Sequence, residues 1–406
     1  MSEMPLIAIV LEAGFYIFLR VTGVAHTSTL VQFANFLNLL TVAGVLYLLK
    51  RSFDAKREAD LFLQRLAKES KNHIQLPGFT SPRFWKQLLD PRHSPQNCFV
   101  HENIPYWTSN EQLMVMEADG LKSVLDMALD VYRPTSAEGG DDRPVFVHIH
   151  GGGWTGGSKS LTGPLLTELI SRQWIVVSVD YRLHSKAGYP SQLIDCKRAL
   201  RWVKDEIRIF GGNPRNVIVG GDSAGGHLAA LLALTPNQPE YQPGFEHVDT
   251  SVQGCVPQSA SFDLVDLKNY SYHGARERFI KEVTRREGAA DSPENIEFLM
   301  EHSPLFRIKE SSIPFLVTHG DLDNLTRVQV ARDFAQEFQK KSTAPLSYLE
   351  IPGGHHCFHV YPSLRSWSTV TAVAEWLEHN FGRYNGNIAS GKKVPVHELV
   401  EWGWSS

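Results

Sequence analysis

Short apolar runs alternate with helical segments between residues 145 and 380, and this alternation limits the fold more than any other feature of the sequence. Residues 145–149 and 174–179 are runs of mainly β-branched and aromatic residues, a pattern typical of strands buried on both faces of a parallel sheet. Helical segments between such strands predict an α/β fold, a mostly parallel sheet with helices on both faces. Ligands of such sheets bind beyond the carboxyl ends of the strands. The other predicted strands are 217–219, 252–256, 315–318 and 346–351, with an outer antiparallel strand within 114–134, and the predicted helices are 199–210, 224–234, 327–340 and 363–380.

The first 52 residues are strongly apolar and predict membrane-anchoring helices. Residues 30–49 carry no charged side chain, and a helix needs about 20 such residues to cross a bilayer. Residues 5–19 form a second apolar run, so one span or a hairpin of two is expected; an apolar helix that caps a soluble domain is the alternative. Basic residues between positions 50 and 57 favour the cytoplasmic side for the rest of the chain, with the lumenal side left open.

The remaining chain divides by composition into three parts. Residues 53–112 predict an amphipathic helix, which ends near residue 70, and an irregular linker that can also cover a site. Residues 113–382 hold the main α/β domain, and a polar, partly helical insert at about 262–303 predicts a lid over a site at the sheet edge. Residues 383–406 form a polar tail to which no role is assigned.

Charge and cysteine content exclude several classes of protein. The net charge is −4, with 40 basic and 44 acidic residues, and the basic residues are scattered rather than clustered, so no nucleic-acid partner is expected. The four cysteines form no C-x-x-C pair, which argues against a zinc knuckle or a disulfide framework. Buried free thiols in a reducing compartment are expected, with one disulfide in a secretory lumen as the alternative. Nothing in the sequence indicates an oligomeric state.

A glycine-flanked serine lies between the predicted strand at 217–219 and the predicted helix at 224–234. A nucleophilic serine on a strand-to-helix turn needs small neighbours because the turn is strained, and the following helix points its amide groups at the site. An ordinary glycine-rich turn is the alternative. This segment, which predicts Ser223 as a nucleophile, reads Gly221-Asp222-Ser223-Ala224-Gly225.

A second glycine-rich segment follows the predicted strand at 145–149. Consecutive glycines let backbone amides point inward, and acyl transfer needs such donors where negative charge develops on the reacting oxygen. We therefore expect Gly152 and Gly153, together with the amide of Ala224, to form an oxyanion hole. A phosphate-binding loop is the alternative, but no lysine follows at the required spacing. The segment reads His150-Gly151-Gly152-Gly153-Trp154, and structural roles are expected for His148 and His150.

A nucleophilic serine needs a base, and the base needs a carboxylate to orient it. Two segments that follow predicted strands supply candidates, in the order acid and then base. In the first, Asp323 is favoured over Asp321; in the second, His356 is favoured over His355. A metal site built from the histidines and the cysteine between 355 and 359 is disfavoured because neighbouring side chains point in opposite directions.

Together these segments resemble the hormone-sensitive-lipase group of α/β hydrolases. The likeness rests on H-G-G-G-W at 150, G-D-S-A-G-G at 221, the H-G-x-x-D pattern at 319 and the G-x-x-H-x-F pattern at 353, and it extends over about residues 145–377. Arylacetamide deacetylase is a more distant relation. The resemblance implies an α/β-hydrolase fold with Ser223, Asp323 and His356 as a catalytic triad. It also implies that the amino-terminal helices and the 262–303 insert form a lid.

The expected function is therefore that of a carboxylic ester hydrolase that works through an acyl-enzyme and without a cofactor. A small-molecule or lipid-like acyl ester is the expected substrate, because an anchored enzyme can take esters from the bilayer. An acyltransferase that uses the same three residues is one alternative. A non-catalytic ligand-binding relative is a less favoured one, because candidates for all three residues are present.

Overall fold

The structure is a computed structural model of the chain. It describes residues 29–70, 97–119, 127–271 and 274–382, and residues 14, 17 and 85 singly. The second apolar run, the linker up to residue 96 and the polar tail therefore fall outside the described ranges.

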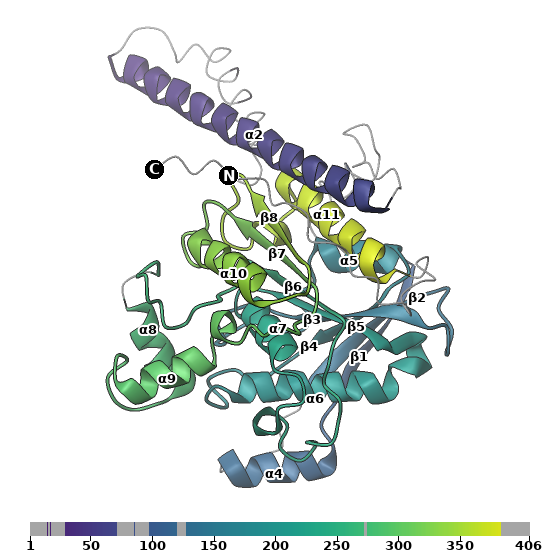
Figure 1. Cartoon of the computed structure of the whole chain (residues 1–406). Helices are drawn as coiled ribbons and strands as arrows, with labels where there is room; N and C mark the ends of the chain where they lie inside the picture. Colours follow the sequence, from purple (N-terminus) through teal and green to yellow (C-terminus); the bar gives the residue numbers. More distant parts are fainter. Residues whose placement is uncertain are drawn as a thin grey trace.

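An eight-stranded sheet forms the centre of the described domain, in the order β1-β2-β4-β3-β5-β6-β7-β8 (Figure 1). Strand β2 runs antiparallel to both of its neighbours, and all pairs from β4 to β8 are parallel. The prediction of a mostly parallel sheet is thus confirmed. The strands are β1 Cys98–Pro105, β2 Ala128–Pro134, β3 Arg143–Ile149, β4 Ile175–Val179, β5 Gly212–Asp222, β6 Gly254–Gln258, β7 Phe315–Gly320 and β8 Leu346–Ile351.

Helices cover both faces of the sheet, and successive residues of the buried strands point to opposite faces. In β3, Val145 and Val147 belong to the apolar cluster under α6, α7 and α10, whereas Phe146 belongs to the cluster under α2, α5 and α11. Every residue of β3 is buried, which explains why most of its side chains are apolar. These helices are α2 Thr29–Ser70, α5 Pro164–Ser171, α6 Ser191–Glu206, α7 Ala224–Leu234, α10 Val328–Lys341 and α11 Leu364–Phe381.

The prediction for residues 71–134 is wrong in two places. Residues 98–105, expected within an irregular linker, form β1, which pairs with β2 in register from Cys98 opposite Pro134. As an edge strand β1 is largely exposed, so its sequence lacks the alternation that marks a half-buried strand. The first part of the expected outer strand is helix α4 (Ser109–Asp119). A reciprocal capping box between Thr108 and Glu111 begins that helix.

Helix α2 runs without a break from residue 29 to residue 70, where a membrane helix and a separate amphipathic helix were expected. Ion pairs one turn apart, Lys50 with Asp54 and Lys56 with Asp60, carry the helix through the expected boundary. Its second half packs on α11 through buried residues such as Ala59 and Leu63. The proposed limits of the membrane-anchoring and linker domains stay a prediction.

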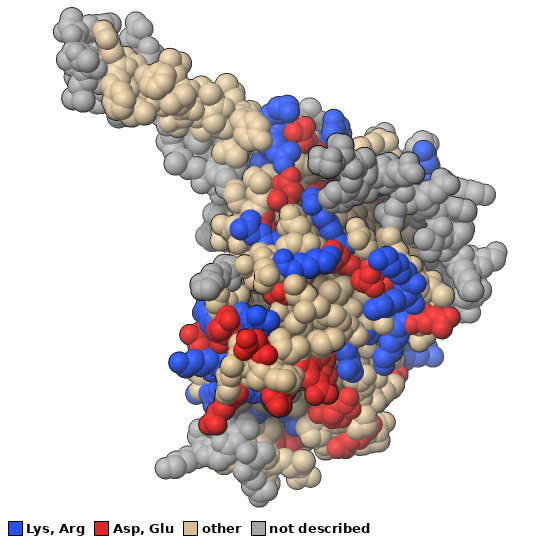
Figure 2. All heavy atoms as spheres, turned by 60° about the vertical axis from the view of Figure 1, so that its left-hand side comes forward, with Lys and Arg blue, Asp and Glu red and all other residues tan. Residues whose placement is uncertain are grey.

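The first half of α2 leaves the domain and is mostly exposed. Phe33, Leu39 and Leu46 are each more than half exposed. Figure 2 shows this half as an uncharged projection, with basic and acidic side chains gathered where the helix meets the domain. Within the described residues α2 is the one helix long and apolar enough, by length and composition, to cross a membrane.

Candidate active site

Ser223 lies in the sharp turn between β5 and α7. Its backbone has φ 56° and ψ −120°, a strained conformation that persists only where the surrounding structure enforces it. The two glycines of the turn show how this happens. A Cβ atom on Gly221 would lie 2.3 Å from the carbonyl oxygen of Ile149, and one on Gly225 would lie 2.0 Å from the same oxygen. The end of β3 therefore passes too close for any other residue at either position.

Loops after β7 and β8 bring an acid and an imidazole to this serine. His356 Nε2 is 2.9 Å from Ser223 Oγ, and His356 Nδ1 is 2.8 Å from Asp323 Oδ2. Of the paired candidates, it is His356 that contacts the serine and Asp323 that contacts His356. Asp321 instead contacts Arg51 and the amide of Gly353. The three side chains thus form one hydrogen-bonded row, the geometry that base-assisted attack by a hydroxyl requires.

Asp323 is buried but remains a carboxylate. One of its oxygens accepts hydrogen bonds from the backbone amides of Leu325 and Thr326, at 3.0 Å and 2.9 Å. Burial alone would raise the pKa of Asp323, but hydrogen bonds from His319 and His356 outweigh it and hold that pKa well below its usual range. The negative charge therefore persists beside the imidazole, where it can stabilise an imidazolium.

Thr326 and His319 also belong to the site, although the sequence reasoning gave neither of them a role. The Thr326 hydroxyl lies 3.0 Å from Asp323 Oδ2 and 3.1 Å from His356 Nδ1, so it touches both members of the acid–base pair. His319 Nε2 lies 3.4 Å from the same carboxylate oxygen. The turn that follows Asp323 carries a usable signal, because an aspartate that caps the amides two and three residues later is a common turn device.

The glycine-rich segment after β3 lies against the serine turn. Gly152 and Gly153 have positive φ values of 119° and 61°, which glycine adopts readily. Gly153 and Ala224 line the same cavity as Ser223, whereas Gly152 lines a neighbouring cavity. Gly153 and Ala224 therefore lie at the serine's cavity and Gly152 lies at the neighbouring one, and the role of their amides as oxyanion donors stays a prediction.

Neighbouring residues of the two motifs hold this loop in place. Asp222 accepts the Gly151 amide at 3.2 Å and contacts His148 Nε2 at 3.2 Å. Burial opposes ionisation of Asp222, but the His148 contacts lower its pKa overall. The His150 ring stacks on Tyr181 with 4.3 Å between ring centroids, and burial lowers the pKa of His150. These contacts favour the structural roles that were expected for His148 and His150.

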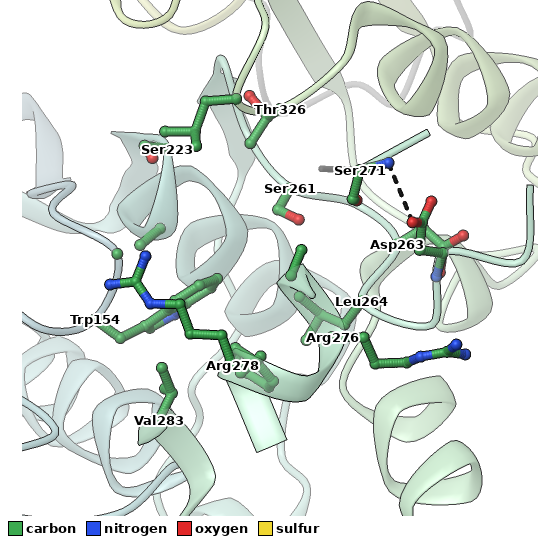
Figure 3. Close-up of a pocket in the computed structure, with 16 residues that line it drawn as sticks. Trp154, Ser223, Ser261, Asp263, Leu264, Ser271, Arg276, Arg278, Val283 and Thr326 are labelled. Atoms are coloured by element: carbon green, nitrogen blue, oxygen red, sulfur yellow. Dashed lines mark hydrogen bonds between the residues drawn. The ribbon is translucent and has the colours of Figure 1, made fainter. Parts of the chain in front are cut away.

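Ser223 opens into a cavity of about 160 Å³ (Figure 3). Trp154 forms one wall, its ring edge-on to Phe279 at 4.8 Å between ring centroids. Figure 3 shows Ser223 and Thr326 at one end of the cavity, with Arg278 reaching over Trp154. Most other lining residues come from the 262–303 insert: Asp263, Leu264, Asp266, Ser271, Ala275, Arg276 and Val283.

The expected lid is thus only partly as predicted. The insert lines the cavity through the loop before α8, helix α8 (Ala275–Arg278) and the π-helical segment Phe279–Thr284. No described residue of α2 lines this cavity, because α2 packs over α11 on the opposite face of the sheet. Within the ranges that the structure describes, no group of three or more histidine, cysteine and acidic side chains is arranged to hold a metal ion.

The family model named BD-FAE matches residues 129–338, which include Ser223 and Asp323 and end before His356. The chain belongs to the BD-FAE family. Membership of this family, together with its esterase relatives, also confirms the likeness to the hormone-sensitive-lipase group.

Curated relatives of this BD-FAE chain include two proteins of Mycobacterium tuberculosis. The probable carboxylic ester hydrolase LipM is 35% identical over 269 residues, which cover 66% of this chain and 62% of LipM. The esterase LipQ is 33% identical over 64% of this chain and 60% of LipQ. The chain therefore spans about three fifths of the length of these relatives.

Among solved structures, a thermophilic esterase from Thermogutta terrifontis superposes on the chain with a TM-score of 0.56 at 23% identity. The superposition covers 72% of this chain and 95% of that esterase. This similarity shows the fold: the BD-FAE chain has the α/β-hydrolase fold.

Proposed function

We propose that the protein is a carboxylic ester hydrolase with Ser223 as nucleophile, His356 as general base and Asp323 as the carboxylate that orients the base. The observation that carries the proposal is the hydrogen-bonded row of these three side chains, with distances of 2.9 Å and 2.8 Å, in which Ser223 lines a cavity. The names of LipM and LipQ, both described as ester hydrolases or esterases, point to the same activity.

In the proposed reaction Ser223 Oγ attacks the ester carbonyl while His356 Nε2 takes the hydroxyl proton. Asp323 accepts the Nδ1 hydrogen bond and stabilises the imidazolium. The alcohol leaves with the proton from His356, and an acyl-enzyme remains on Ser223. Water then attacks the acyl group, again through His356, and the carboxylic acid is released with the serine restored.

The amides of Gly152, Gly153 and Ala224 would hold the oxyanion of each tetrahedral intermediate. Each well-placed donor stabilises such an intermediate by roughly 3 kcal/mol. Trp154 lines the cavity, and the other residues of the two motifs support these donors by keeping the backbone close: His150, Gly151, Gly221, Asp222 and Gly225.

Labelling with a fluorophosphonate probe tests the nucleophile, and paired histidine variants test the base. We expect the wild-type protein to be labelled and to hydrolyse short aryl esters, and Ser223→Ala to lose both properties while keeping its unfolding curve. His356→Ala should lose turnover, whereas His355→Ala, the neighbouring histidine, should retain it. Normal turnover in Ser223→Ala or His356→Ala would remove the mechanism.

We further propose that the exposed half of α2 anchors the enzyme in a membrane, with the catalytic domain on the cytoplasmic side by the positive-inside rule. Its exposed apolar side chains and the basic residues that follow support this placement. Recovery of the full-length protein in the soluble fraction, without detergent, would contradict anchoring.

The proposed substrates are esters with a short acyl group on an amphipathic or lipid-like remainder. The cavity at Ser223, about 160 Å³, is smaller than the range of about 300–1,000 Å³ usual for drug-sized ligands, and serine and aspartate side chains form part of its wall. Exposed apolar side chains on loops near the site, Leu161, Leu322, Leu325 and Tyr361, suit an ester that stays partly in the bilayer. An ester panel that varies acyl and alcohol lengths separately tests this: kcat/KM should fall with acyl length and tolerate a long alcohol.

A further inference from the structure

Helix α2 contacts the two loops that carry the acid and the base. The guanidinium of Arg51 forms an ion pair with Asp321 Oδ2. The other oxygen of that carboxylate accepts a hydrogen bond from the backbone amide of Gly353 at 2.6 Å. Asp321 lies two residues before Asp323, and Gly353 lies three residues before His356. Arg51 of the proposed anchor helix is therefore linked to both loops through the carboxylate of Asp321.

A second arginine reinforces this junction from α11. Arg365 is fully buried, and it donates from Nε to the carbonyl of Pro352 at 3.0 Å and from a terminal nitrogen to the carbonyl of Leu48 at 3.1 Å. Gly353 lies between the two arginines, because a Cβ atom there would come within 2.7 Å of Arg365 and 3.0 Å of the Arg51 Cβ. The turn after β8 is thus held between α2 and α11.

The two loops also bind each other, so the contact with Arg51 acts on both. The amide of Asp321 donates to Ile351 at 3.2 Å, and that of Leu322 donates to Gly354 at 3.0 Å. A Cβ atom on Gly320 would lie 2.2 Å from the carbonyl oxygen of Gly354. Because the loops touch backbone to backbone, a shift of Asp321 moves the segments that lead to Asp323 and His356 together.

We infer that Arg51 and Asp321 are positioning residues for the acid–base pair, so that α2 is part of the catalytic structure as well as the proposed anchor. This inference rests on the proposed hydrolase function. Neither residue belongs to the hydrogen-bonded row; they act through the backbone of the two loops. A displacement of about 1 Å at a catalytic group can cost about 100-fold in rate, so losing the ion pair is expected to lower kcat far more than it changes KM.

The test uses the full-length protein in detergent, with Arg51→Met, Arg51→Lys, Asp321→Asn and the control Arg57→Met. Arg57 lies on the same helix, its side chain is 71% exposed, and it pairs only with the neighbouring Glu58 among the described residues. We expect Arg51→Met and Asp321→Asn to lower kcat about 10- to 100-fold with KM within about twofold. Arg51→Lys should recover part of the loss, and Arg57→Met should match the wild type.

Two further readouts separate positioning from folding and from a failure of the proposed function. All rates are compared well below the midpoint of each variant's unfolding curve, and hydrogen exchange is followed at residues 320–323 and 352–357. Faster exchange confined to these segments in Arg51→Met supports the inference. Wild-type kcat and exchange in both Arg51→Met and Asp321→Asn would overturn it. If the wild type itself hydrolyses no ester, the proposed function fails, and the exchange data alone decide whether Arg51 orders the two loops.

Discussion

Replacing Gly225 by alanine is the sharpest test of how the serine turn is built. The added Cβ would lie 2.0 Å from the Ile149 carbonyl oxygen and 2.4 Å from that of His150. Both are backbone atoms, so no flexible side chain can move aside. To reach an ordinary contact of 3.4 Å, the start of α7 and the end of β3 must separate by about 1.4 Å, the difference between 3.4 and 2.0 Å.

That separation changes both stability and rate. Overpacking of this kind costs about 1–3 kcal/mol of the free energy of unfolding. Ser223 lies two residues before the substitution, and a displacement near 1 Å at a reacting atom lowers the rate about 100-fold. Gly156→Ala is the matched control in the glycine-rich loop, because its Cβ would have no neighbour closer than 4.0 Å and its φ is not positive.

The assay combines kcat for a short aryl ester, the rate of fluorophosphonate labelling, and urea unfolding followed by tryptophan fluorescence. We expect Gly225→Ala to lose about two orders of magnitude in kcat and in labelling rate, and Gly156→Ala to keep both near wild type. Equal kcat and equal unfolding free energy in Gly225→Ala and the wild type would refute the close approach of β3 to the turn.

Three further predictions concern the surroundings of the site. Thr326→Val should lower kcat about tenfold, because a hydrogen bond to a charged group contributes about 1.5–3 kcal/mol, whereas Thr326→Ser should keep kcat near the wild-type value. Equal kcat in all three proteins would exclude a role of the hydroxyl in catalysis. Leu63→Ala should lower the free energy of unfolding by about 2–5 kcal/mol, whereas Leu40→Ala, at a position 55% exposed, should leave it unchanged if the second half of α2 belongs to the domain core. Burial lowers the pKa of His227 to about 4, so between about pH 6.5 and 4 the unfolded chain binds a proton that the folded protein does not. The free energy of unfolding should therefore decrease as the pH is lowered from about 6.5 to 4, and an unchanged slope in His227→Gln would contradict this.

The parts of the site that follow strands could be predicted from sequence because each motif is local. The segments at Ser223, Asp323 and His356 each follow a buried strand, and parallel strands bring their carboxyl ends to one edge of the sheet. The sequence also favoured Asp323 over Asp321, and only the meeting of the three side chains needed coordinates. What the sequence did not show is the contact of Asp321 with Arg51, a residue 270 positions earlier in the chain.

Other features were missed because they depend on partners far away in the chain. Strand β1 has a sequence without a buried face, and its pairing with β2 gives it its conformation. The sequence of α2 changes from apolar to charged near residue 52, but an apolar face of the helix continues and packs on α11, more than 300 residues later in the chain. Local periodicity cannot show which surface such a helix will cover.

The order of the strands explains why the loop that carries His356 needs contacts with residues outside that loop to hold it in place. His356 follows β8, which is three strands away from β5, where Ser223 lies. Neighbouring strands are about 4.8 Å apart, so the β8 loop must reach back over about 14 Å to place its imidazole at the serine. The acid after β7 needs to cross only two of these spacings. A loop with such a reach gains from fixed points near its start, and Pro352 and Gly353 are where Arg365 and Asp321 bind it. Arg51 in turn holds Asp321 in place, so the loop with the longest reach in the site begins where α2 meets the domain.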